Sequence, residues 1–246
     1  MNDKAAKLSP NIEEYPLQQS ITTIDGKALE KQRLKLERQK LINENNARFK
    51  TYLDSLPELM YPSFYKVECI GDLDEANDRL SCLAANEKIF GMDLEWPPTF
   101  IKGQQEKKTS LVQICSANSI LLLQIGQMQA FPNELKRFFE DKKVLKSGVN
   151  IGADGLKLYR DFGIKTNGLV ELRDIVESVE SSKLEKSNLR SLRALAGIFM
   201  DQNMPKGKVR ISNWSKVKLS AMQIKYAAND AYVSWNMTDV WVGNAD

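Results

Sequence analysis

Histidine is absent from this chain of 246 residues. Its absence excludes nucleophilic triads that use histidine, zinc sites of the Cys/His type and any mechanism with a histidine general base. Acid–base chemistry is therefore left to Asp, Glu, Tyr, Lys or a metal-bound water. Cysteine is scarce as well, because Cys69, Cys82 and Cys115 are odd in number and show no CxxC spacing. We expect neither a disulfide framework nor a Cys-rich metal site, and this usage is typical of a reducing intracellular compartment.

The chain also lacks the usual signals for membranes, export and nucleotide-binding loops. No run of 18 apolar residues occurs, so we expect no membrane-spanning segment. The residues before Arg33 include Asp3, Glu13 and Glu14, which is a poor match to a secretory signal or an Arg-rich transit peptide. Neither GxGxxG nor GxxxxGK[ST] is present. The net charge of +3 is too small to predict nucleic-acid binding by itself.

Changes in composition divide the chain into three parts. Residues 1–26 are polar and aperiodic, which predicts a disordered tail. Residues 27–60 predict a basic helical extension, because the stretch 27–50 has eight Lys or Arg against three Glu and contains no Gly or Pro. We interpret this stretch as a solvated basic helix or, alternatively, as an arm that docks a protein partner or nucleic acid. The compact domain is expected at 63–246.

The apolar pattern of that domain predicts an α/β fold with a mixed sheet. Strands are expected at 65–70, 89–96, 110–116, 119–125 and 143–149, with the third and fourth forming a hairpin, while 169–176 fits a strand or a helix. Helices are expected at 72–86, 132–141, 152–162, 189–200 and 219–242, with Asp72 as N-cap, Gly163 as C-cap and 202–218 as an irregular basic loop.

Acidic residues interrupt a segment that is otherwise expected to be buried. Asp93 and Glu95 are two residues apart in a predicted strand, so both project from one face of the sheet. Two enclosed carboxylates repel each other and lose hydration, and a divalent cation would neutralise them. The alternative is a half-exposed strand with a polar face.

Two further segments add to this set. Asp154 opens a predicted helix, where it also complements the helix dipole. Tyr226 and Asp230 are four residues apart on the last helix and share a face, which a simple surface pair would also do. Oxygen ligands without His or clustered Cys select hard cations such as Mg²⁺ or Mn²⁺. Two such ions ~3.5–4 Å apart catalyse phosphodiester hydrolysis.

With these residues assembled, the sequence resembles the DEDD superfamily of 3′–5′ exonucleases. The likeness is to the tyrosine-containing branch, most of all to Werner-syndrome-type exonuclease domains, with ribonuclease D further away. The segments that carry it are Asp93–Pro98, Ser110–Cys115, Gly148–Asp154, Lys157–Phe162, Ser212–Lys216 and Tyr226–Tyr232. The resemblance covers roughly residues 63–242 and implies a ribonuclease-H-like fold with a mixed, roughly five-stranded sheet flanked by helices.

The resemblance also implies roles for the acidic residues and the tyrosine. Asp93 would bridge two Mg²⁺ or Mn²⁺ ions, Glu95 and Asp230 would complete the site of the water-activating ion, and Asp154 would serve the second ion. Tyr226 would orient the attacking water. The sister branch uses histidine in place of this tyrosine, so a chain without histidine does not fit that branch.

Substrate contacts are expected around this site. Met92 and Leu94 would lie beside the terminal base, with Leu94 as a wedge. Residues 202–220 contain no acid but several Lys and Arg, as a polyanionic substrate requires. Trp214, in the same stretch, either stacks on a base or anchors the loop in the core. The predicted substrate-binding residues are Met92, Leu94, Trp96, Asn150, Lys157, Arg210, Trp214 and Lys216.

The function that follows is hydrolysis of the last phosphodiester bond of DNA, releasing nucleoside 5′-monophosphates from a 3′ end. The alternatives are trimming of RNA 3′ ends and a nucleic-acid-binding adaptor built on an exonuclease scaffold. The expected partners are single-stranded or 3′-recessed nucleic acid and, through residues 27–50, a protein, but no membrane. The expected location is intracellular and favours the nucleus, with cytoplasm and mitochondrion left open.

Overall fold

The structure of the protein is a computed structural model that describes residues 22–179, 191–205 and 207–243. The chain divides into two units, Met1–Phe49 and Lys50–Asp246. The predicted tail lies outside the described residues as far as position 21, and helix α1 (Thr22–Ser55) begins before the predicted start of the basic extension. The division into a tail, an extension and a domain at 1–26, 27–60 and 63–246 stays a prediction.

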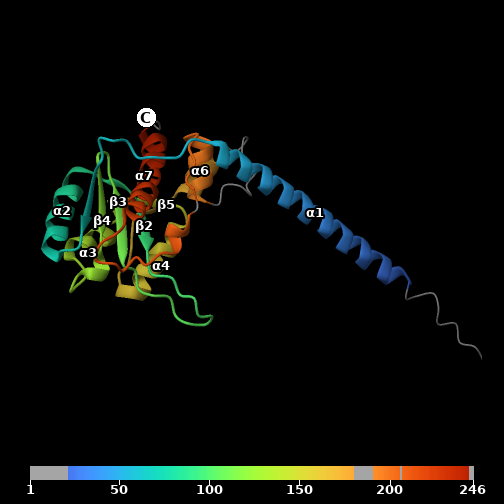
Figure 1. The fold of residues 1–246 in the computed structure, drawn as a ribbon, viewed down its shortest axis with the longest axis horizontal. Helices are drawn as coiled ribbons and strands as arrows, with labels where there is room; N and C mark the ends of the chain where they lie inside the picture. The colour runs from blue at the N-terminus through green and yellow to red at the C-terminus, as the bar shows by residue number, and fades with distance from the viewer. Residues whose placement is uncertain (1–21, 180–190, 206, 244–246) are drawn as a thin grey trace, which may run out of the picture. The chain divides into compact units, whose positions relative to one another are not determined.

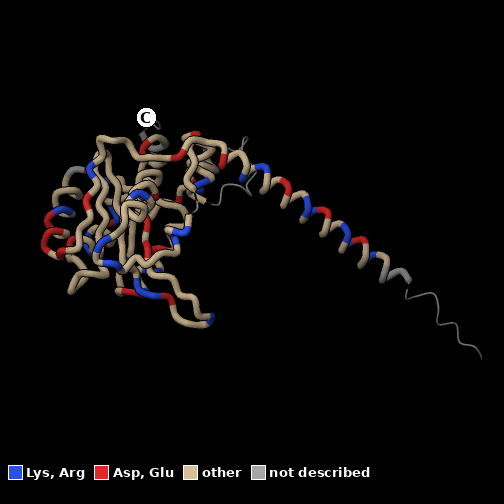
Figure 2. Tube along the Cα trace, viewed as in Figure 1, with Lys and Arg blue, Asp and Glu red and all other residues tan. Residues whose placement is uncertain are grey.

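Within Met1–Phe49, the described residues belong to helix α1. Basic and acidic residues alternate along this helix (Figure 2), and Arg33 pairs with Glu37 one turn later at an Nε–Oε1 distance of 3.2 Å. Leu29, Leu34 and Leu36 are each more than half exposed. The stretch therefore has no continuous apolar seam, as expected of a solvated basic helix.

The second unit is built on a six-stranded mixed sheet with the order β1-β4-β3-β2-β5-β6 (Figure 1). The strands are β1 (Lys66–Ile70), β2 (Ile89–Glu95), β3 (Leu111–Cys115), β4 (Ser119–Leu123), β5 (Leu145–Gly148) and β6 (Leu169–Glu171). Strand β3 is antiparallel to both of its neighbours, whereas the β1–β4, β2–β5 and β5–β6 pairs are parallel. The predicted α/β class with a mixed sheet and a β3–β4 hairpin is confirmed.

The sheet has six strands where about five were expected. The extra strand comes from the segment 169–176, for which strand and helix were both open. It divides into the short strand β6 and helix α5 (Leu172–Val179). Glu171 ends the strand, and the helix that follows buries Leu172 and Val176 one turn apart.

The remaining helices match the predicted order. They are α2 (Leu73–Asn86), α3 (Asn133–Glu140), α4 (Ile151–Phe162), α6 (Leu192–Phe199) and α7 (Ala221–Gly243), with short 3₁₀ turns η1 (Ile125–Gln127) and η2 (Lys208–Ile211). Asp72 accepts hydrogen bonds from the Asp74 and Glu75 amides at 3.0 and 2.9 Å, as predicted for an N-cap. Gly163 ends α4 with a φ of 72°, as predicted for a C-cap. The first residues of the predicted helix 189–200 lie outside the described residues.

Helices cover both faces of the sheet (Figure 1). Strand β3 is buried on both sides, with Leu111 and Cys115 facing α5, α6 and α7, and Val112 and Ile114 facing α2, α3 and α4. The alternation follows from the two-residue period of a strand. The result is a three-layer arrangement with one apolar core on each side of the sheet.

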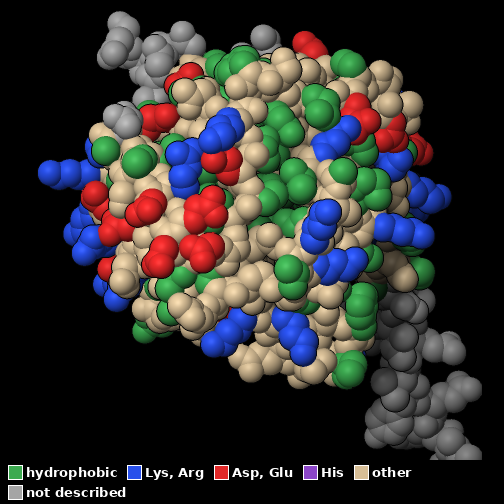
Figure 3. Space-filling view, turned by 60° about the vertical axis from the view of Figure 1, so that its left-hand side comes forward, with side chains coloured by type: hydrophobic (Ala, Val, Ile, Leu, Met, Phe, Trp, Pro, Cys, Tyr) green, Lys and Arg blue, Asp and Glu red, His purple; other side chains and the backbone are tan. Residues whose placement is uncertain are grey.

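Charge is unevenly distributed over the surface. Helix α2 begins with Asp72, Asp74 and Glu75. On the face seen in Figure 3, acidic side chains gather toward one side, and apolar side chains separate them from several Lys and Arg side chains. The two signs are therefore partly segregated on this face.

Helix α7 crosses the sheet in direct contact with strand β2. A Cβ atom built on Gly91 would lie 2.2 Å from both the Ala231 carbonyl oxygen and the Trp235 amide nitrogen. Only a residue without a side chain permits this approach of two backbones. The contact sets how deeply α7 sits on β2, the two elements that carry most of the predicted site.

The segment before β1 is tied to α7 as well. The side-chain amide of Asn229 donates to the Leu59 carbonyl at 3.0 Å, and its oxygen accepts from the Tyr61 amide at 3.0 Å. Lys225 pairs with Glu58 at 2.6 Å. Residues 58–61 are thus part of the packed unit, upstream of the predicted start of the domain at 63.

None of the helices in the described parts of the chain combines the length and apolar character that crossing a bilayer would require.

Replacing Gly91 with alanine should destabilise the protein by about 1–3 kcal/mol or more, because the new methyl group overlaps backbone atoms that cannot rotate away. Urea unfolding measures the change. The control is Gly152→Ala in α4, where an added Cβ meets nothing within 4 Å and should stabilise the helix by about 0.5–1 kcal/mol. Equal effects of the two substitutions would contradict the close contact.

Candidate active site

Strand β2 and helix α7 bring three carboxylates together. Asp93, Glu95 and Asp230 each place one oxygen within 4.8 Å of the other two. Glu95 is 8% exposed and Asp230 is 6% exposed, and an oxygen of Asp93 accepts the Leu94 amide hydrogen at 2.9 Å. The predicted projection of Asp93 and Glu95 from one strand face is confirmed, because both reach the same acid on α7.

Asp154 joins these acids from a third element. It lies in the first turn of α4, which follows strand β5, and β5 pairs with β2. Its negative charge raises the pKa of Glu95, and its own pKa is raised by Asp93 and Glu171 after the larger effect of burial. Asp154 lies outside the tight group of three. All four predicted acids nevertheless converge on one region.

Burial is the main reason that these acids have raised pKa values. It raises the pKa of Asp93 from 3.8 to about 6, that of Asp154 to about 8 and that of Glu95 to about 10, and repulsion by neighbouring acids adds to the shifts of Asp154 and Glu95. The pKa of Asp230 is also raised well above its usual value by burial and by Asp93. The cluster therefore keeps protons at neutral pH until a cation replaces them.

The cluster also lacks a protein counter-charge. Among the described residues, no Lys or Arg nitrogen lies within ion-pair distance of these four acids. Arg210 lies near enough to lower the pKa of Glu95, but does not form an ion pair with it. Closely spaced carboxylates with buried oxygens and no cationic partner fit a hard divalent cation.

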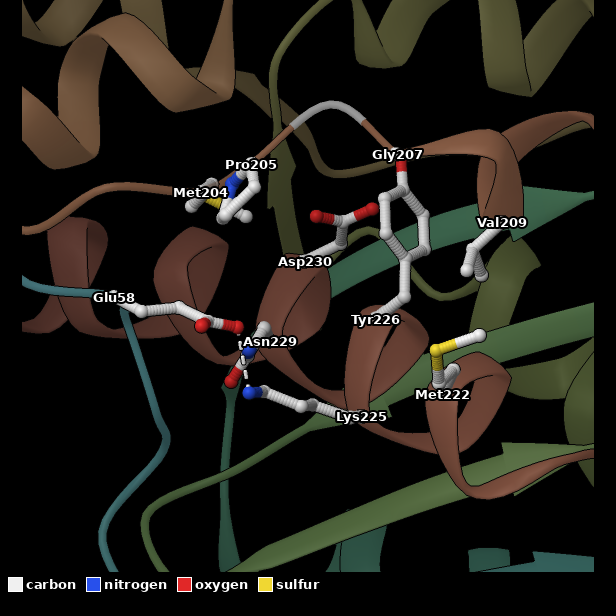
Figure 4. Close-up of a pocket in the computed structure, with 10 residues that line it drawn as sticks. All are labelled: Glu58, Met204, Pro205, Gly207, Val209, Met222, Lys225, Tyr226, Asn229 and Asp230. Carbon is white, nitrogen blue, oxygen red and sulfur yellow. Dashed lines mark hydrogen bonds and ion pairs between the residues drawn. The ribbon is translucent and has the colours of Figure 1, made fainter. Parts of the chain in front are cut away.

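Tyr226 lies one turn before Asp230 on α7. Figure 4 shows both side chains projecting on the same side of the helix toward the segment that runs from Met204 to Val209. Burial, followed by the charges of Asp230 and Glu95, raises the pKa of the Tyr226 hydroxyl above its usual value of 10. The phenol therefore stays protonated near neutral pH and can donate a hydrogen bond.

Trp214 packs against the ring of Tyr226 from the side of the core. Its ring is 1% exposed, its centroid lies 6.1 Å from that of Tyr226, and its Nε1 donates to the Arg210 carbonyl at 3.3 Å. Of the two interpretations of Trp214, the core anchor is confirmed. The prediction that it binds substrate by stacking on a base is wrong, because its faces are covered by the core.

Side-chain amides hold the rest of the predicted basic loop. Gln124 donates to the Lys216 carbonyl at 2.9 Å, and Gln127 donates to the Ser215 carbonyl at 2.7 Å. Gln223, in the first turn of α7, donates to the Asn213 carbonyl at 3.1 Å. The loop is therefore anchored to both the sheet and α7, which the sequence pattern did not indicate.

Two neighbouring cavities open at the acids. A cavity of about 310 Å³ is lined by Asp93, Arg210, Tyr226 and Asp230, together with Met92, Val149, Ser191, Leu192, Arg193, Met204, Pro205 and Ser234. The cavity in Figure 4, of about 250 Å³, shares Met204, Pro205, Tyr226 and Asp230 with it. The first has the more basic lining and includes the β2 acid, so it suits a phosphate-bearing ligand.

The side chain of Leu94 faces away from these cavities. Asp93 and Glu95 point toward α7, so the residue between them points to the opposite face, where Leu94 is 3% exposed within the other core. The prediction that Leu94 wedges against a terminal base is therefore wrong. Met92 is 1% exposed in that same core but also lines the cavity beside Asp93, and its predicted substrate contact stays a prediction.

Lys157 is an internal cation and does not face a ligand. Its side chain is 3% exposed, its Nζ lies 3.0 Å from Asp161 and donates to the Lys107 carbonyl at 2.9 Å, and it sits 4.5 Å from the centre of the Trp96 ring. The prediction that Lys157 binds substrate is wrong, because this position falls on the buried side of α4. The half-buried Trp96 ring is engaged by Lys157, and its predicted role as a substrate contact has no support in these contacts.

Three predicted contacts remain at the surface. Arg210 is exposed and lines the larger cavity. Asn150 is exposed at the start of α4 with a φ of 61°, and its backbone amide hydrogen-bonds to Glu171. Lys216 is exposed, and its backbone carbonyl is held by Gln124. Their contacts with substrate stay predictions.

Sequence reasoning missed several residues that shape the site. Gln113 lies directly across from Asp93 on β3, is fully buried and has no hydrogen-bond partner for its side-chain amide among the described residues. Arg193 lines the larger cavity and donates to Asn203 at 2.9 Å. The sequence does contain a signal for Gln113, because it is a polar residue in the middle of the otherwise apolar stretch 111–115. No local signal was available for Arg193, because only the tertiary fold brings α6 to the acids.

The sequence profile of a 3′–5′ exonuclease family matches residues 67–239. A Mus musculus protein, bifunctional 3′–5′ exonuclease/ATP-dependent helicase WRN, is 34% identical over 183 residues, which are 73% of this chain and 13% of that protein. An Arabidopsis thaliana 3′–5′ exonuclease is 30% identical over 153 residues, which are 62% of this chain and 52% of that protein. The chain therefore spans only part of the length of the curated relatives that it matches.

A solved structure supports the same fold. The crystal structure of Trypanosoma brucei RNase D is similar with a TM-score of 0.64 and 20% identity, covering 74% of this chain and 66% of that one. At this identity the likeness concerns the fold, a mixed sheet flanked by helices, and carries no statement about substrate.

The raised carboxyl pKa values predict how stability depends on pH without metal. Asp93 has an unfolded pKa near 3.8 and a folded pKa of about 6, so the folded state binds more protons within that window. The free energy of unfolding should therefore fall as pH rises from about 4 to 6. In EDTA at pH 8, Asp93→Asn should be more stable than wild type by on the order of 3 kcal/mol, whereas below pH 4 the two should be equal.

Urea unfolding with EDTA or Mn²⁺ measures both effects. Mn²⁺ should stabilise the wild type and do much less for Asp93→Asn, because the ion binds the folded carboxylates. The matched control is Asp239→Asn, which removes an exposed acid from α7 and should follow the wild type in both buffers. A loss of stability in Asp93→Asn at pH 8 in EDTA would mean that burial of the charged Asp93 carboxylate does not destabilise the metal-free protein.

Proposed function

The chain belongs to the 3′–5′ exonuclease family of the DEDD superfamily, and we propose that it hydrolyses the terminal phosphodiester bond of DNA, releasing nucleoside 5′-monophosphates from a 3′ end. The observation that carries this proposal is the convergence of Asp93, Glu95 and Asp230 within 4.8 Å, with Asp154 beside them and no ion pair to a Lys or Arg in the described parts of the chain. At these acids a substrate phosphate is accommodated only when cations are bound, whereas contacts elsewhere on the surface do not depend on them.

The acids fit two Mg²⁺ or Mn²⁺ ions. Asp93 raises the pKa of both Asp154 and Asp230 and would contact both ions, with Glu95 and Asp230 completing one site and Asp154 serving the other. The chemistry that two bound ions supply is the activation of a water molecule and the stabilisation of the leaving oxyanion. Their proximity would also lower the raised pKa values of the carboxyls, so that binding releases protons.

Tyr226 and Arg210 complete the proposed machinery. The protonated Tyr226 hydroxyl projects beside Asp230, where it would orient the attacking water by a hydrogen bond. Arg210 is exposed at the rim of the cavity that contains Asp93, and its guanidinium would bind a phosphate oxygen. Trp214 acts indirectly, because it supports the Tyr226 ring from the core.

DNA and RNA remain separate candidates for the substrate. The resemblance to Werner-syndrome-type exonuclease domains supports DNA as the first candidate, and the mouse relative is named as an exonuclease and helicase. Solved relatives with the same fold include RNase D bound to RNA, and RNA trimming is therefore the second candidate. A non-catalytic nucleic-acid-binding adaptor is less favoured, because all five proposed catalytic positions carry the required side chains.

We predict that Asp93→Ala and Asp230→Ala each lower mononucleotide release by at least about a thousandfold, since each removes a ligand of the proposed metal centre. Tyr226→Phe should lower it by about a hundredfold, because the ring packs normally but the donor is lost. The assay follows 3′-labelled DNA and RNA strands of the same sequence, single and duplex, in EDTA and then in added Mg²⁺ or Mn²⁺.

The control for these variants is Asp239→Asn, an exposed change on the same helix, which should retain wild-type activity. Full activity of either alanine variant, or activity in EDTA, would refute the metal-dependent proposal. Faster release from RNA than from DNA would select the second candidate. Binding without release in every metal would select the adaptor.

We further propose that residues 27–50 recruit a protein partner. The described part of this stretch is a highly charged helix with exposed leucines, Leu29, Leu34, Leu36 and Leu41. The nucleus stays the favoured location on family grounds.

A chain without residues 1–49 keeps the whole unit Lys50–Asp246 and should cleave short oligonucleotides at the wild-type rate. It should lose association with the partner in a pull-down from cell extract, measured against the full chain. An unchanged pull-down would rule out recruitment by the helix, whereas a slower intrinsic rate would assign the helix to substrate binding.

A further inference from the structure

The connection between β2 and β3 leaves the sheet after Glu95, one of the proposed metal ligands, and returns to the sheet beside the same residue. Strand β2 ends at Glu95, and β3 begins at Leu111, the residue that pairs with Glu95 in the sheet. The Ser110 amide donates to the Glu95 carbonyl at 2.9 Å. Residues 96–110 therefore leave and return at the edge of the proposed catalytic centre, and they project beyond the strands as the green loop in Figure 1.

The returning part of this connection is fixed to helix α4. Thr109 donates to Asp161 twice, from its amide at 2.7 Å and from its hydroxyl at 2.8 Å. The buried Lys157 donates to the Lys107 carbonyl at 2.9 Å, and Lys108 lies 5.7 Å from the centre of the Phe162 ring. The base of the loop is thus held by the same helix that carries Asp154.

The tip of the connection is an ordered turn with an apolar surface. The Gln104 amide donates to the Ile101 carbonyl at 3.1 Å, and Gly103 supplies the left-handed residue with a φ of 84°. Just at this turn, Phe100 is 81% exposed and Ile101 is 70% exposed. These two adjacent large apolar side chains are therefore available to contact a ligand.

The charge around the tip is positive. Residues 97–108 contain Lys102, Lys107 and Lys108, all exposed, and one acid, Glu106. Glu106 is already paired with Arg160 at 3.5 Å and lies 3.9 Å from Lys157. An aromatic ring beside lysines matches the way in which proteins hold single strands, by stacking bases and by binding phosphates.

We propose that the tip of this connection, formed by Phe100, Ile101 and Lys102, binds the nucleic-acid strand upstream of the bond that is cleaved, with a base stacked on Phe100. The proposal rests on the proposed function and adds a second contact to it. Phe100 lies five positions after Glu95, so the tip lies at most about 18 Å from the acid along the chain. That distance corresponds to about five nucleotides of a helical strand.

The length of the substrate tests this contact. A dinucleotide occupies the metal centre alone, whereas a decanucleotide also reaches the tip. In Phe100→Ala, hydrolysis of a dinucleotide should be unchanged, while the dissociation constant of a 5′-fluorescein decanucleotide, measured by anisotropy in EDTA, should rise about fivefold or more. Phe100→Trp should restore binding, because a larger ring preserves stacking.

Two further variants separate stacking from other causes. Phe64→Ala removes another exposed phenylalanine, 69% exposed, which precedes the edge strand β1, and it should leave decanucleotide binding unchanged. Lys102→Gln should weaken binding. It should also reduce the slope of the logarithm of the dissociation constant against the logarithm of the salt concentration by about the amount expected for one phosphate contact.

Unchanged decanucleotide binding in Phe100→Ala would overturn the proposal, as would equal loss in Phe64→Ala. A loss of dinucleotide hydrolysis in Phe100→Ala would also overturn it, because the tip would then act on the catalytic centre itself. Failure of the wild type to hydrolyse any strand would refute the proposed function, while the binding measurements in EDTA would still decide whether the tip contacts nucleic acid.

Discussion

The contact between strand β2 and helix α7 is the constraint on which the rest of the molecule depends. Because Gly91 has no side chain, the backbone of α7 near Ala231 and Trp235 lies directly on the strand. This approach brings an acid of α7 to within reach of the two acids of β2. A helix held farther from the sheet would leave Asp230 on a separate surface. The depth of one helix on one strand therefore decides whether the carboxylates form a site.

The electrostatic conflict that results is unusual for a protein core. Burial raises the pKa of all four acids, and repulsion by neighbouring acids adds to this in Glu95, Asp154 and Asp230, yet no ion pair among the described residues relieves them. Elsewhere in the same fold, buried charge is compensated: Lys146 donates to the Phe138 and Asp141 carbonyls at 3.0 Å, and Lys157 pairs with Asp161. Among the buried charges, these acids are thus the ones that a bound cation would stabilise.

Much of this arrangement was predictable from local sequence. The spacing of Asp93 and Glu95 in a strand, and of Tyr226 and Asp230 in a helix, fixes which face each side chain takes, and regular backbone periodicity preserves it. The same rule, applied fully, also places Leu94 on the opposite face, so the expected wedge was an error of reasoning about the strand. Lys157 and Trp214 could not be assigned locally, because their burial depends on the β2–β3 connection and on Tyr226, which are distant in sequence. The sixth strand was equally ambiguous, since three residues are too few for a period to emerge.

The two hydrogen bonds between Asn229 and residues 59–61 limit where this chain can be truncated. Truncating the chain to begin at residue 63 would remove both hydrogen-bond partners of the Asn229 side-chain amide. Asn229 directly precedes Asp230, one of the acids of the proposed metal site. A minimal fragment must accordingly include Leu59 and Tyr61, which belong to the unit that begins at Lys50. The segment ahead of β1 therefore belongs to the packed unit.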